Sequence, residues 1–292
     1  MPQDFFAAYI NLDRVPGRRL FMERQLAAAC IAAERISAVD RNAPGFTPRG
    51  GLKIQREDVL IEMNWDGRTY VTGEEACAQS HILALGRFLE SGMPHALIME
   101  DDAELGPDFR AVVEAALKHA SLWDAVKLEG NRAKGGRPAL AIAGLTNPYR
   151  LVASMSPAAG TAAMLFSRAG AERLLAALEG VFEPYDNVVS DLGRNGLRLL
   201  DVAPFPARQG IAESSRTDRR TKPRRGLLAA LDKWQRHTRA DLLRRNLYRW
   251  TAQFGRYPGR AFALTYASWA ITWPNPPQPT PQLTQQSGTT PS

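Results

Sequence analysis

Residues 95–102 read HALIMEDD, an apolar run that ends in three consecutive carboxylates. Four to eight apolar residues between polar ones are typical of a strand buried on both faces, and in open α/β sheets ligands bind beyond the carboxyl ends of such strands. We therefore expect a buried strand that delivers Glu100, Asp101 and Asp102 to a sheet edge. Because side chains alternate along a strand, Glu100 and Asp102 are expected to face the same way and Asp101 another, unless the chain has already turned.

The acidic triplet indicates a divalent cation. Three adjacent carboxylates repel one another, and a bound cation relieves that repulsion. Hard oxygen ligands favour Mg²⁺ or Mn²⁺, ions that commonly carry the phosphates of a substrate. The triplet alone also fits an acidic loop that precedes a helix near Asp108.

Composition narrows the class of protein. The 292 residues, 45 % of them hydrophobic, fit one or two globular domains. Neither Cys30 nor Cys77 sits in a CxxC or Cys/His metal spacing, so neither a disulfide framework nor a structural zinc is expected. The start of the chain has Asp4 and no basic region of a signal peptide, and no apolar run reaches the roughly 20 residues that span a bilayer. We expect a cytoplasmic protein, with peripheral attachment to the cytoplasmic face of the inner membrane as an option.

Charge divides the chain into a body and a basic C-terminal region. Residues 216–260 hold 14 of the 37 Lys and Arg residues but only 3 of the 30 Asp and Glu residues, so the rest of the chain is mildly acidic. This asymmetry predicts a globular body over residues 1–215 and a basic, amphipathic extension over 216–273. Residues 274–292 are rich in Pro, Gln and Thr, which is typical of a disordered tail.

The body reads as alternating strands and helices, which predicts an α/β fold with a mostly parallel sheet flanked by helices. Residues 41–58 and the polar segment 130–150 are expected to be loops because they are rich in Gly, Pro and charge. Ser167 is expected to cap a helix. The expected strands are 5–12, 36–39, 95–99, 125–128 and 160–166, and the expected helices are 18–29, 74–89, 108–119 and 169–178.

Four segments in order resemble glycosyltransferase family 25. They are YINLDR at 9–14, TGEEACAQSH at 72–81, LIMEDDAEL at 97–105, and a late region from Gly160 to Asp186. The resemblance covers roughly residues 5–215. Ala76 and Met164 depart from the residues usual in the family, which leaves open a catalytically degenerate binding or scaffold protein of the same fold.

The resemblance implies a GT-A-type fold that binds a nucleotide-diphosphate sugar, with UDP-galactose as the expected donor, and a Mn²⁺ or Mg²⁺ ion that bridges the diphosphate to the acidic triplet. Asp102 is the expected direct metal ligand, assisted by Glu100, while Glu100 and Asp101 are expected to bond ribose or metal-bound water. A metal stabilises the negative charge that develops on a departing diphosphate. A metal-dependent phosphoesterase, the enzymatic alternative, lacks the His/Asp spacing expected for its site.

Donor contacts are expected at the ends of two strands. Asn11, Arg14 and Arg18 follow the first strand, where arginines can pair with phosphate oxygens. Lys127 ends the strand at 125–128 and is a further candidate for a phosphate contact, although a surface lysine is an equal alternative.

The resemblance also implies inversion at the sugar carbon, which needs a carboxylate to accept the acceptor's proton. Glu129, Asp186 and Asp191 are candidates, of which Asp186 aligns best with the family's late acidic position. Asp186 and Asp101 are the expected catalytic residues, with acceptor binding as the alternative role of Asp186. His81 has no companion His at metal spacing, so a structural role is as good as a functional one.

The basic region from 226 to 254 interleaves Leu, Trp and Phe with Arg at nearly helical spacing. Such a stretch is typical of an interfacial helix attracted to anionic lipid, although packing on the catalytic body would give the same pattern. No motif for nucleic acid accompanies the charge, so no nucleic-acid partner is expected. Together with these features, the resemblance to family 25 implies an inverting, metal-dependent glycosyltransferase that acts on a lipid-linked or oligosaccharide acceptor at the cell surface, as in lipopolysaccharide biosynthesis.

Overall fold

The computed structural model describes residues 3–49, 60–62, 69–130, 137–155, 160–180, 184–210, 239–258 and 262–265. The basic segment 216–238, the expected disordered tail 274–292 and parts of both expected loops lie outside these ranges. The larger helices are α1 (Pro16–Ala28), α2 (Thr72–Glu90), α3 (Phe109–Leu117), α4 (Arg168–Leu178) and α8 (Arg239–Arg256). The shorter ones are α5 (Tyr185–Ser190) and α6 (Leu192–Asn195).

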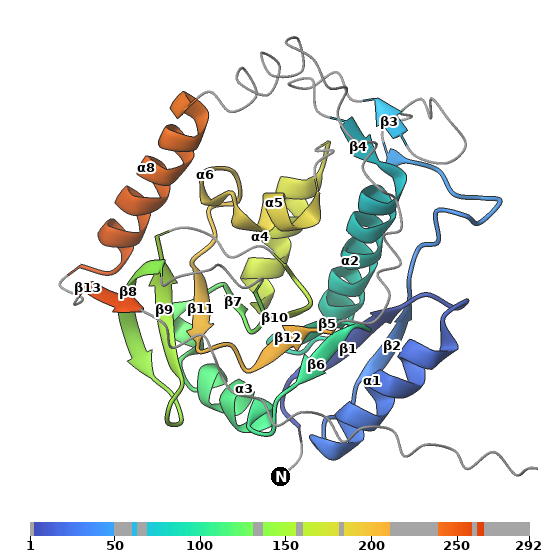
Figure 1. Ribbon diagram of the computed structural model, residues 1–292, viewed down its shortest axis with the longest axis horizontal. Coiled ribbons are helices and arrows are strands. Elements are labelled where there is room, and N and C mark those ends of the chain that lie inside the picture. The colour runs from blue at the N-terminus through green and yellow to red at the C-terminus, as the bar shows by residue number, and fades with distance from the viewer. Residues whose placement is uncertain are drawn as a thin grey trace, which may run out of the picture.

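The described strands form one large sheet and two small ones (Figure 1). The large sheet has the order β13-β8-β9-β11-β7-β10-β5-β1-β2, and the pairs β12-β6 and β3-β4 stand apart from it. The strands are β1 (Phe6–Asn11), β2 (Glu34–Ser37), β3 (Leu60–Glu62), β4 (Thr69–Val71), β5 (His95–Glu100), β6 (Ala103–Leu105), β7 (Ala125–Lys127), β8 (Arg137–Gly144), β9 (Arg150–Ser154), β10 (Ala163–Ser167), β11 (Leu199–Ala203), β12 (Ala207–Gln209) and β13 (Phe262–Thr265).

The sheet is mixed, so the expectation of a mostly parallel sheet was wrong. Strand β1 pairs in parallel with β2 and β5, and β11 pairs in parallel with β7. Strand β10 instead runs antiparallel to both β5 and β7, and the edge from β11 through β9 and β8 to β13 is antiparallel throughout. A buried apolar run has the same composition in either direction, and the direction of β10 depends on a chain reversal that the run itself does not encode.

Two apolar layers enclose the sheet. Along β1, Ala7 and Tyr9 face a cluster that includes α1 and α3, whereas Ala8 and Ile10 face a second cluster that includes α2 and α4. This alternation is the period of two expected for a strand buried on both faces. The five strands and four helices expected from the sequence of the body are therefore present, and the Ser167 hydroxyl caps α4 by accepting a hydrogen bond from the Gly170 amide at 3.0 Å.

The segment 130–150 is not only a loop, because β8 occupies Arg137–Gly144 and pairs with β9. A short loop around a cis Asn147-Pro148 bond joins the two strands. The Gly- and Pro-rich composition that suggested a loop belongs in part to this hairpin and in part to residues outside the described ranges.

Part of the basic C-terminal region packs on the body. Strand β13 adds to the edge of the large sheet beside β8, and α8 lies against α6 (Figure 1). Arg249 of α8 is buried, with Nε donating to the Ser154 carbonyl at 2.9 Å and a guanidinium nitrogen donating to the Ser190 carbonyl at 3.0 Å. This is the packing that the sequence left open as an alternative to membrane binding. Within the described ranges, no helix has both the length and the apolar character needed to cross a bilayer.

Candidate active site

A cavity of about 260 Å³ opens beyond the carboxyl ends of β1, β2 and β5. The first turns of α2, residues Gly160 and Thr161 before β10, the start of α5 and Gln209 complete its wall. The cavity therefore lies where the sequence placed the ligand site, at the edge to which β5 delivers its acids.

All three acids of the triplet line the cavity. Strand β5 ends at Glu100, and the chain then turns, with the Asp101 amide bonded to the Ile10 carbonyl at 3.1 Å. Glu100 contacts groups on the α2 side of the sheet, whereas Asp101 and Asp102 contact groups on the α1 and β12 side. The strand alternation expected for Glu100 and Asp102 is lost because of this turn.

Asp101 is held in place by residues that follow β1. Its Oδ2 accepts a hydrogen bond from Asn11 Nδ2 at 2.7 Å, and its Oδ1 accepts one from Arg18 at 3.0 Å. Burial raises the pKa of Asp101, while the hydrogen bonds and charge of Asn11 and Arg18 oppose that rise. Both oxygens are engaged, so Asp101 positions the turn and orients Arg18 toward the cavity.

Asp102 differs because one of its oxygens has no partner. Its Oδ2 accepts a hydrogen bond from Gln209 at 3.0 Å and lies 3.9 Å from an Arg18 nitrogen. Its Oδ1 is buried without a hydrogen bond from the residues that the structure describes. Burial, followed by the charge of Glu100, raises the pKa of Asp102 to about 6. A buried carboxylate oxygen without a donor beside a second carboxylate is the arrangement that a divalent cation would satisfy.

Glu100 projects toward α2 and the start of β10. Its Oε1 accepts a hydrogen bond from the Thr161 hydroxyl at 3.0 Å and lies 3.3 Å from His81 Nε2. The imidazole of His81 stacks on the ring of Tyr185, with the ring centroids 3.9 Å apart. His81 is thus part of the cavity wall and not only of the helix packing beneath it.

The donor-binding candidates are not equally well placed. Asn11 is buried behind Asp101, Arg18 lies in the cavity wall, and Arg14 also lines the cavity, where its Nε donates to Asp40 at 2.7 Å. Lys127 is fully buried and is not among the described residues that line the cavity. It lies opposite Asp201 in the β7–β11 register, and burial lowers its pKa while the charges of Asp201 and Glu129 oppose that change. This placement offers Lys127 no route to a phosphate in the cavity.

Among the three carboxylates proposed as base, the structure brings Asp186 to the cavity, at the start of α5. Asp191 and Glu129 are not among the described lining residues. Glu129 is buried behind Gly160, where it accepts a hydrogen bond from the Ala162 amide at 3.2 Å, and burial raises its pKa to about 7. Gly160 has a φ of +95°, and a Cβ there would lie 2.6 Å from the Glu129 carboxylate, so only glycine fits between Glu129 and the cavity.

Several cavity residues had no assigned role in the sequence analysis. Thr161, Tyr185 and Gln209 bond or stack against the acidic triplet or its partner His81. Cys77 also lines the cavity, one helical turn from His81. Tyr185 and Cys77 lie inside segments that resemble the family, whereas Gln209 carries no signal in the sequence because its contact with Asp102 spans 107 residues.

One comparison with known proteins gives a match to a protein family. The model for Glycosyltransferase family 25 (LPS biosynthesis protein) matches residues 6–138, which include β1, α2 and the acidic triplet. No curated protein matches the chain.

Three solved structures show a distant likeness. A197 from STIV is 12 % identical with a TM-score of 0.32, covering 68 % of this chain and 83 % of A197. A provisionally named nucleotide-diphospho-sugar transferase from Desulfovibrio desulfuricans G20 is 12 % identical with a TM-score of 0.37, covering 84 % and 99 % of the two chains. Mannose-1-phosphate geranyltransferase from Thermus thermophilus is 13 % identical with a TM-score of 0.33, covering 68 % and 74 %.

These TM-scores are too low to carry a conclusion about this chain. The family match is independent of them, and it confirms the resemblance for the three sequence segments that lie within residues 6–138. The segment from Gly160 to Asp186 lies beyond the match. Over residues 6–138, the chain matches the model of glycosyltransferase family 25, and this match supports a glycosyltransferase.

Proposed function

We propose that the chain is an inverting, metal-dependent glycosyltransferase with a GT-A-type fold that moves galactose from a nucleotide-diphosphate sugar to a glycolipid or oligosaccharide acceptor of the cell surface. The observation that carries this proposal is the buried Asp102 at the cavity wall, with its orphaned Oδ1, the guanidinium of Arg18 nearby and the partly buried Glu100 in the same wall. Hard oxygen donors, one of them unsatisfied, fit Mn²⁺ or Mg²⁺.

The charges around the cavity suit a donor with a diphosphate. Arg14 and Arg18 present cationic groups at the end of β1, next to the acids that would hold the metal through Asp102 and Glu100. When bound, the metal would supply positive charge to the diphosphate as it leaves. Asp101 accepts a hydrogen bond from one guanidinium nitrogen of Arg18 at 3.0 Å. This bond fixes the orientation of the Arg18 side chain in the cavity wall.

Inversion requires one displacement at the anomeric carbon. The acceptor hydroxyl oxygen forms the new bond to that carbon, the bond to the diphosphate oxygen breaks and its electron pair leaves with the nucleotide diphosphate, and the hydroxyl proton passes to a carboxylate. We assign that carboxylate to Asp186, because among Glu129, Asp186 and Asp191 it is the one that lies in the described cavity wall. A carboxylate within hydrogen-bond reach of the acceptor is what general-base catalysis requires.

A screen of nucleotide sugars for Mn²⁺-dependent binding, followed by transfer to lipid-A-core or free oligosaccharide acceptors, tests the function. Mn²⁺-dependent transfer of galactose from UDP-galactose would support it. Binding without turnover of any donor would indicate a degenerate binding protein, and release of phosphate from simple esters would indicate a phosphoesterase.

The role of Asp186 has a separate test. Asp186→Ala is expected to lose transfer to the acceptor, either because the chemical step is lost or because the acceptor no longer binds. Slow hydrolysis of the donor in the absence of acceptor helps to separate these two causes. If Asp186 is the base, the variant loses transfer with an unchanged KM for the acceptor. If that KM rises while kcat at saturation is kept, Asp186 binds the acceptor and the assignment as base is wrong.

A further inference from the structure

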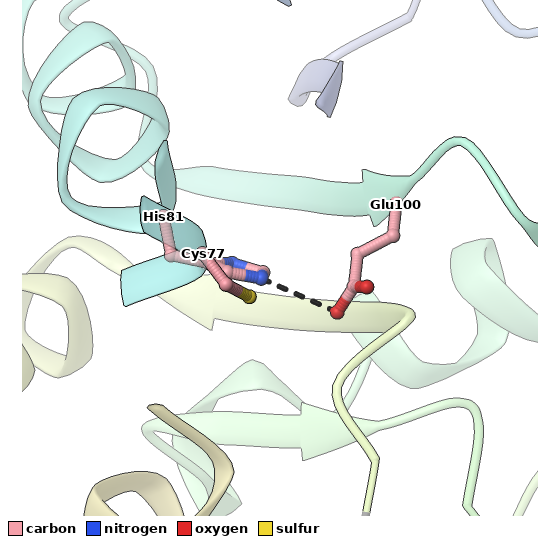
Figure 2. Close-up of side chains that lie close together, drawn as sticks. All are labelled: Cys77, His81 and Glu100. Atoms are coloured by element: carbon pink, nitrogen blue, oxygen red, sulfur yellow. Dashed lines mark hydrogen bonds and ion pairs between the residues drawn. The ribbon is translucent and has the colours of Figure 1, made fainter. Parts of the chain in front are cut away.

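Three side chains with different donor atoms converge on one wall of the cavity. Cys77 and His81 lie four residues apart on α2, so they share a face of the helix, and Glu100 ends the adjacent strand β5 (Figure 2). One potential ligand atom from each of the three lies within 4.8 Å of the other two. Figure 2 shows the thiol, the imidazole and the carboxylate pointing toward one another.

The spacing between His81 and Glu100 fits a metal better than it fits an ion pair. Their Nε2 and Oε1 atoms are 3.3 Å apart, whereas a charge-assisted bond between a protonated imidazole and a carboxylate is usually about 2.7–2.9 Å. Two ligands at about 2.0–2.1 Å from a tetrahedral zinc ion are roughly 3.3–3.4 Å apart. The observed distance of 3.3 Å agrees with that separation.

The hydrogen-bonding environment of His81 also favours a bound cation. The imidazole is 2 % exposed, and its Nδ1 has no hydrogen-bond partner among the described residues. If the proton sits on Nε2, a buried Nδ1 lone pair is unpaired; if it sits on Nδ1, the Nε2 lone pair faces a carboxylate oxygen. A cation between Nε2 and Glu100 converts that second, repulsive arrangement into two ligand bonds.

The ligands are held in position before any metal arrives. The ring of His81 stacks on Tyr185 with an angle of 10° between the ring planes, and the Thr161 hydroxyl fixes Oε1 of Glu100 at 3.0 Å. Cys77 is a reduced cysteine, and it lines the cavity together with His81 and Glu100. A metal held by these three groups would keep a fourth position open toward the cavity, which is the pattern of a reactive zinc site.

We propose that Cys77, His81 and Glu100 form a zinc site whose fourth ligand is water or an oxygen of the bound molecule. Thiolate and imidazole select Zn²⁺ over Mn²⁺ and Mg²⁺, so this site differs in chemistry from the carboxylate site at Asp102. The proposal of a zinc site does not depend on the proposed sugar-transfer activity. The local sequence spacing does not indicate zinc because the third ligand comes from β5, outside the Cys-x₃-His pattern of α2.

Cobalt is the probe that tests the site, because a bond between Co²⁺ and a thiolate gives a charge-transfer absorption band that oxygen ligands do not give. The chain has two cysteines, and Cys30 is exposed on the surface. In the full-length Cys30→Ser protein, Cys77 is the single thiol. We expect one equivalent of Co²⁺ to produce the band in this variant, and stoichiometric Zn²⁺ to remove it.

Three further variants separate this site from its neighbours. Cys77→Ser is expected to lose the band, and His81→Gln to weaken Zn²⁺ binding at least about tenfold, whereas Asp102→Asn is expected to keep both the band and the zinc affinity. The proposal is overturned if Cys30→Ser shows no band, if the band survives in Cys77→Ser, or if Asp102→Asn abolishes zinc binding. Loss of sugar transfer in Asp102→Asn with intact zinc binding would show that the zinc site, although it shares Glu100 with the proposed carboxylate site, does not depend on Asp102.

Discussion

Asn11, at the end of β1, donates a hydrogen bond of 2.7 Å to Asp101 across 90 residues of sequence. Asn11 is 1 % exposed and Asp101 is 7 % exposed, so the bond is shielded from water. It ties the first strand of the chain to the turn that carries the acidic triplet. The geometry of the site therefore depends on a residue that need not touch the donor.

Removing this amide is expected to destabilise the protein. In Asn11→Ala, Asp101 keeps Arg18 but loses its shortest hydrogen bond, and a buried acceptor left unsatisfied costs roughly 1–3 kcal/mol. Urea unfolding followed by circular dichroism measures this loss. The matched control is Arg14→Ala, because the Arg14–Asp40 pair is partly exposed and is worth at most about 1 kcal/mol. We expect Arg14→Ala to weaken donor binding with little change in unfolding free energy, and equal destabilisation of the two variants would contradict this account.

The contacts of Asp124 lead to a prediction of how the free energy of unfolding changes as the pH falls. Asp124 accepts hydrogen bonds from the Arg198 amide at 2.9 Å and from the side chains of Arg198 and Arg173, each at 2.8 Å. Burial alone would raise the pKa of Asp124, but these partners outweigh it and the pKa is lowered.

A carboxyl with a lowered folded-state pKa contributes stability above its unfolded pKa, near 4, and that contribution is lost as the pH falls through the folded pKa. Unfolding free energies measured from pH 6 down to pH 3 should therefore fall more steeply for the wild type than for Asp124→Asn. Parallel curves over this range would show that the Asp124 cluster contributes nothing to acid sensitivity.

The contact of α8 with the body makes a prediction about the C-terminal region. Arg249 donates one buried hydrogen bond to the Ser154 carbonyl and one partly buried hydrogen bond to the Ser190 carbonyl, and a bond to a charged group is worth roughly 1.5–3 kcal/mol. Arg249→Ala should lower the free energy of unfolding by roughly 3 kcal/mol or more. Leu247→Ala on the same helix is the control, because Leu247 is 62 % exposed and its loss should cost within about 0.5 kcal/mol. Similar small effects of both variants would mean that α8 is not docked in solution.

The outward face of α8 keeps the membrane prediction open to test. Leu247, Tyr248 and Phe254 are exposed apolar side chains on the helix whose Arg249 faces the body. The double variant Leu247→Ala, Phe254→Ala should sediment less with anionic vesicles at low salt than the wild type does, and neither protein should sediment with neutral vesicles. Unchanged sedimentation of the double variant would exclude this face from lipid binding.

The sequence was sufficient to predict the elements that have a clear local pattern of apolar residues or a helix cap. The alternating core of β1, the apolar run of β5 and the capped start of α4 all follow from local patterns. Strand β8 was missed because it follows a Gly-rich segment and contains Pro138, features that favour loops in a local reading. The antiparallel direction of β10 follows from chain reversal and pairing with β5 and β7, which no local pattern contains.

The sequence identified several residues of the candidate site but not the contacts between them. The acidic triplet, Asn11 and Arg18 were identified, but their pairing requires β1 and β5 to lie side by side. Gln209 reaches Asp102 from β12, and Tyr185 reaches His81 from α5, so both contacts exist only in the folded chain. Lys127 was expected at the phosphate because it ends a strand, yet its side chain is buried among Asp201, Glu129 and Asp186.

The proposed metal site depends most on the carboxylate of Asp102, whose Oδ1 is buried without a partner among the described residues. Asp102→Asn keeps the shape of the side chain and its hydrogen-bonding capacity toward Gln209 but removes the charge that a metal needs. Because burial already disfavours the charged form, the neutral amide is not expected to lower the free energy of unfolding.

The most direct measurement is Mn²⁺-dependent transfer from UDP-galactose by the wild type and by Asp102→Asn, with urea unfolding of both proteins as the check on folding. We expect the variant to lose transfer by about 100-fold or more and to keep the unfolding midpoint of the wild type. Metal-dependent transfer at the wild-type rate in folded Asp102→Asn would contradict this expectation.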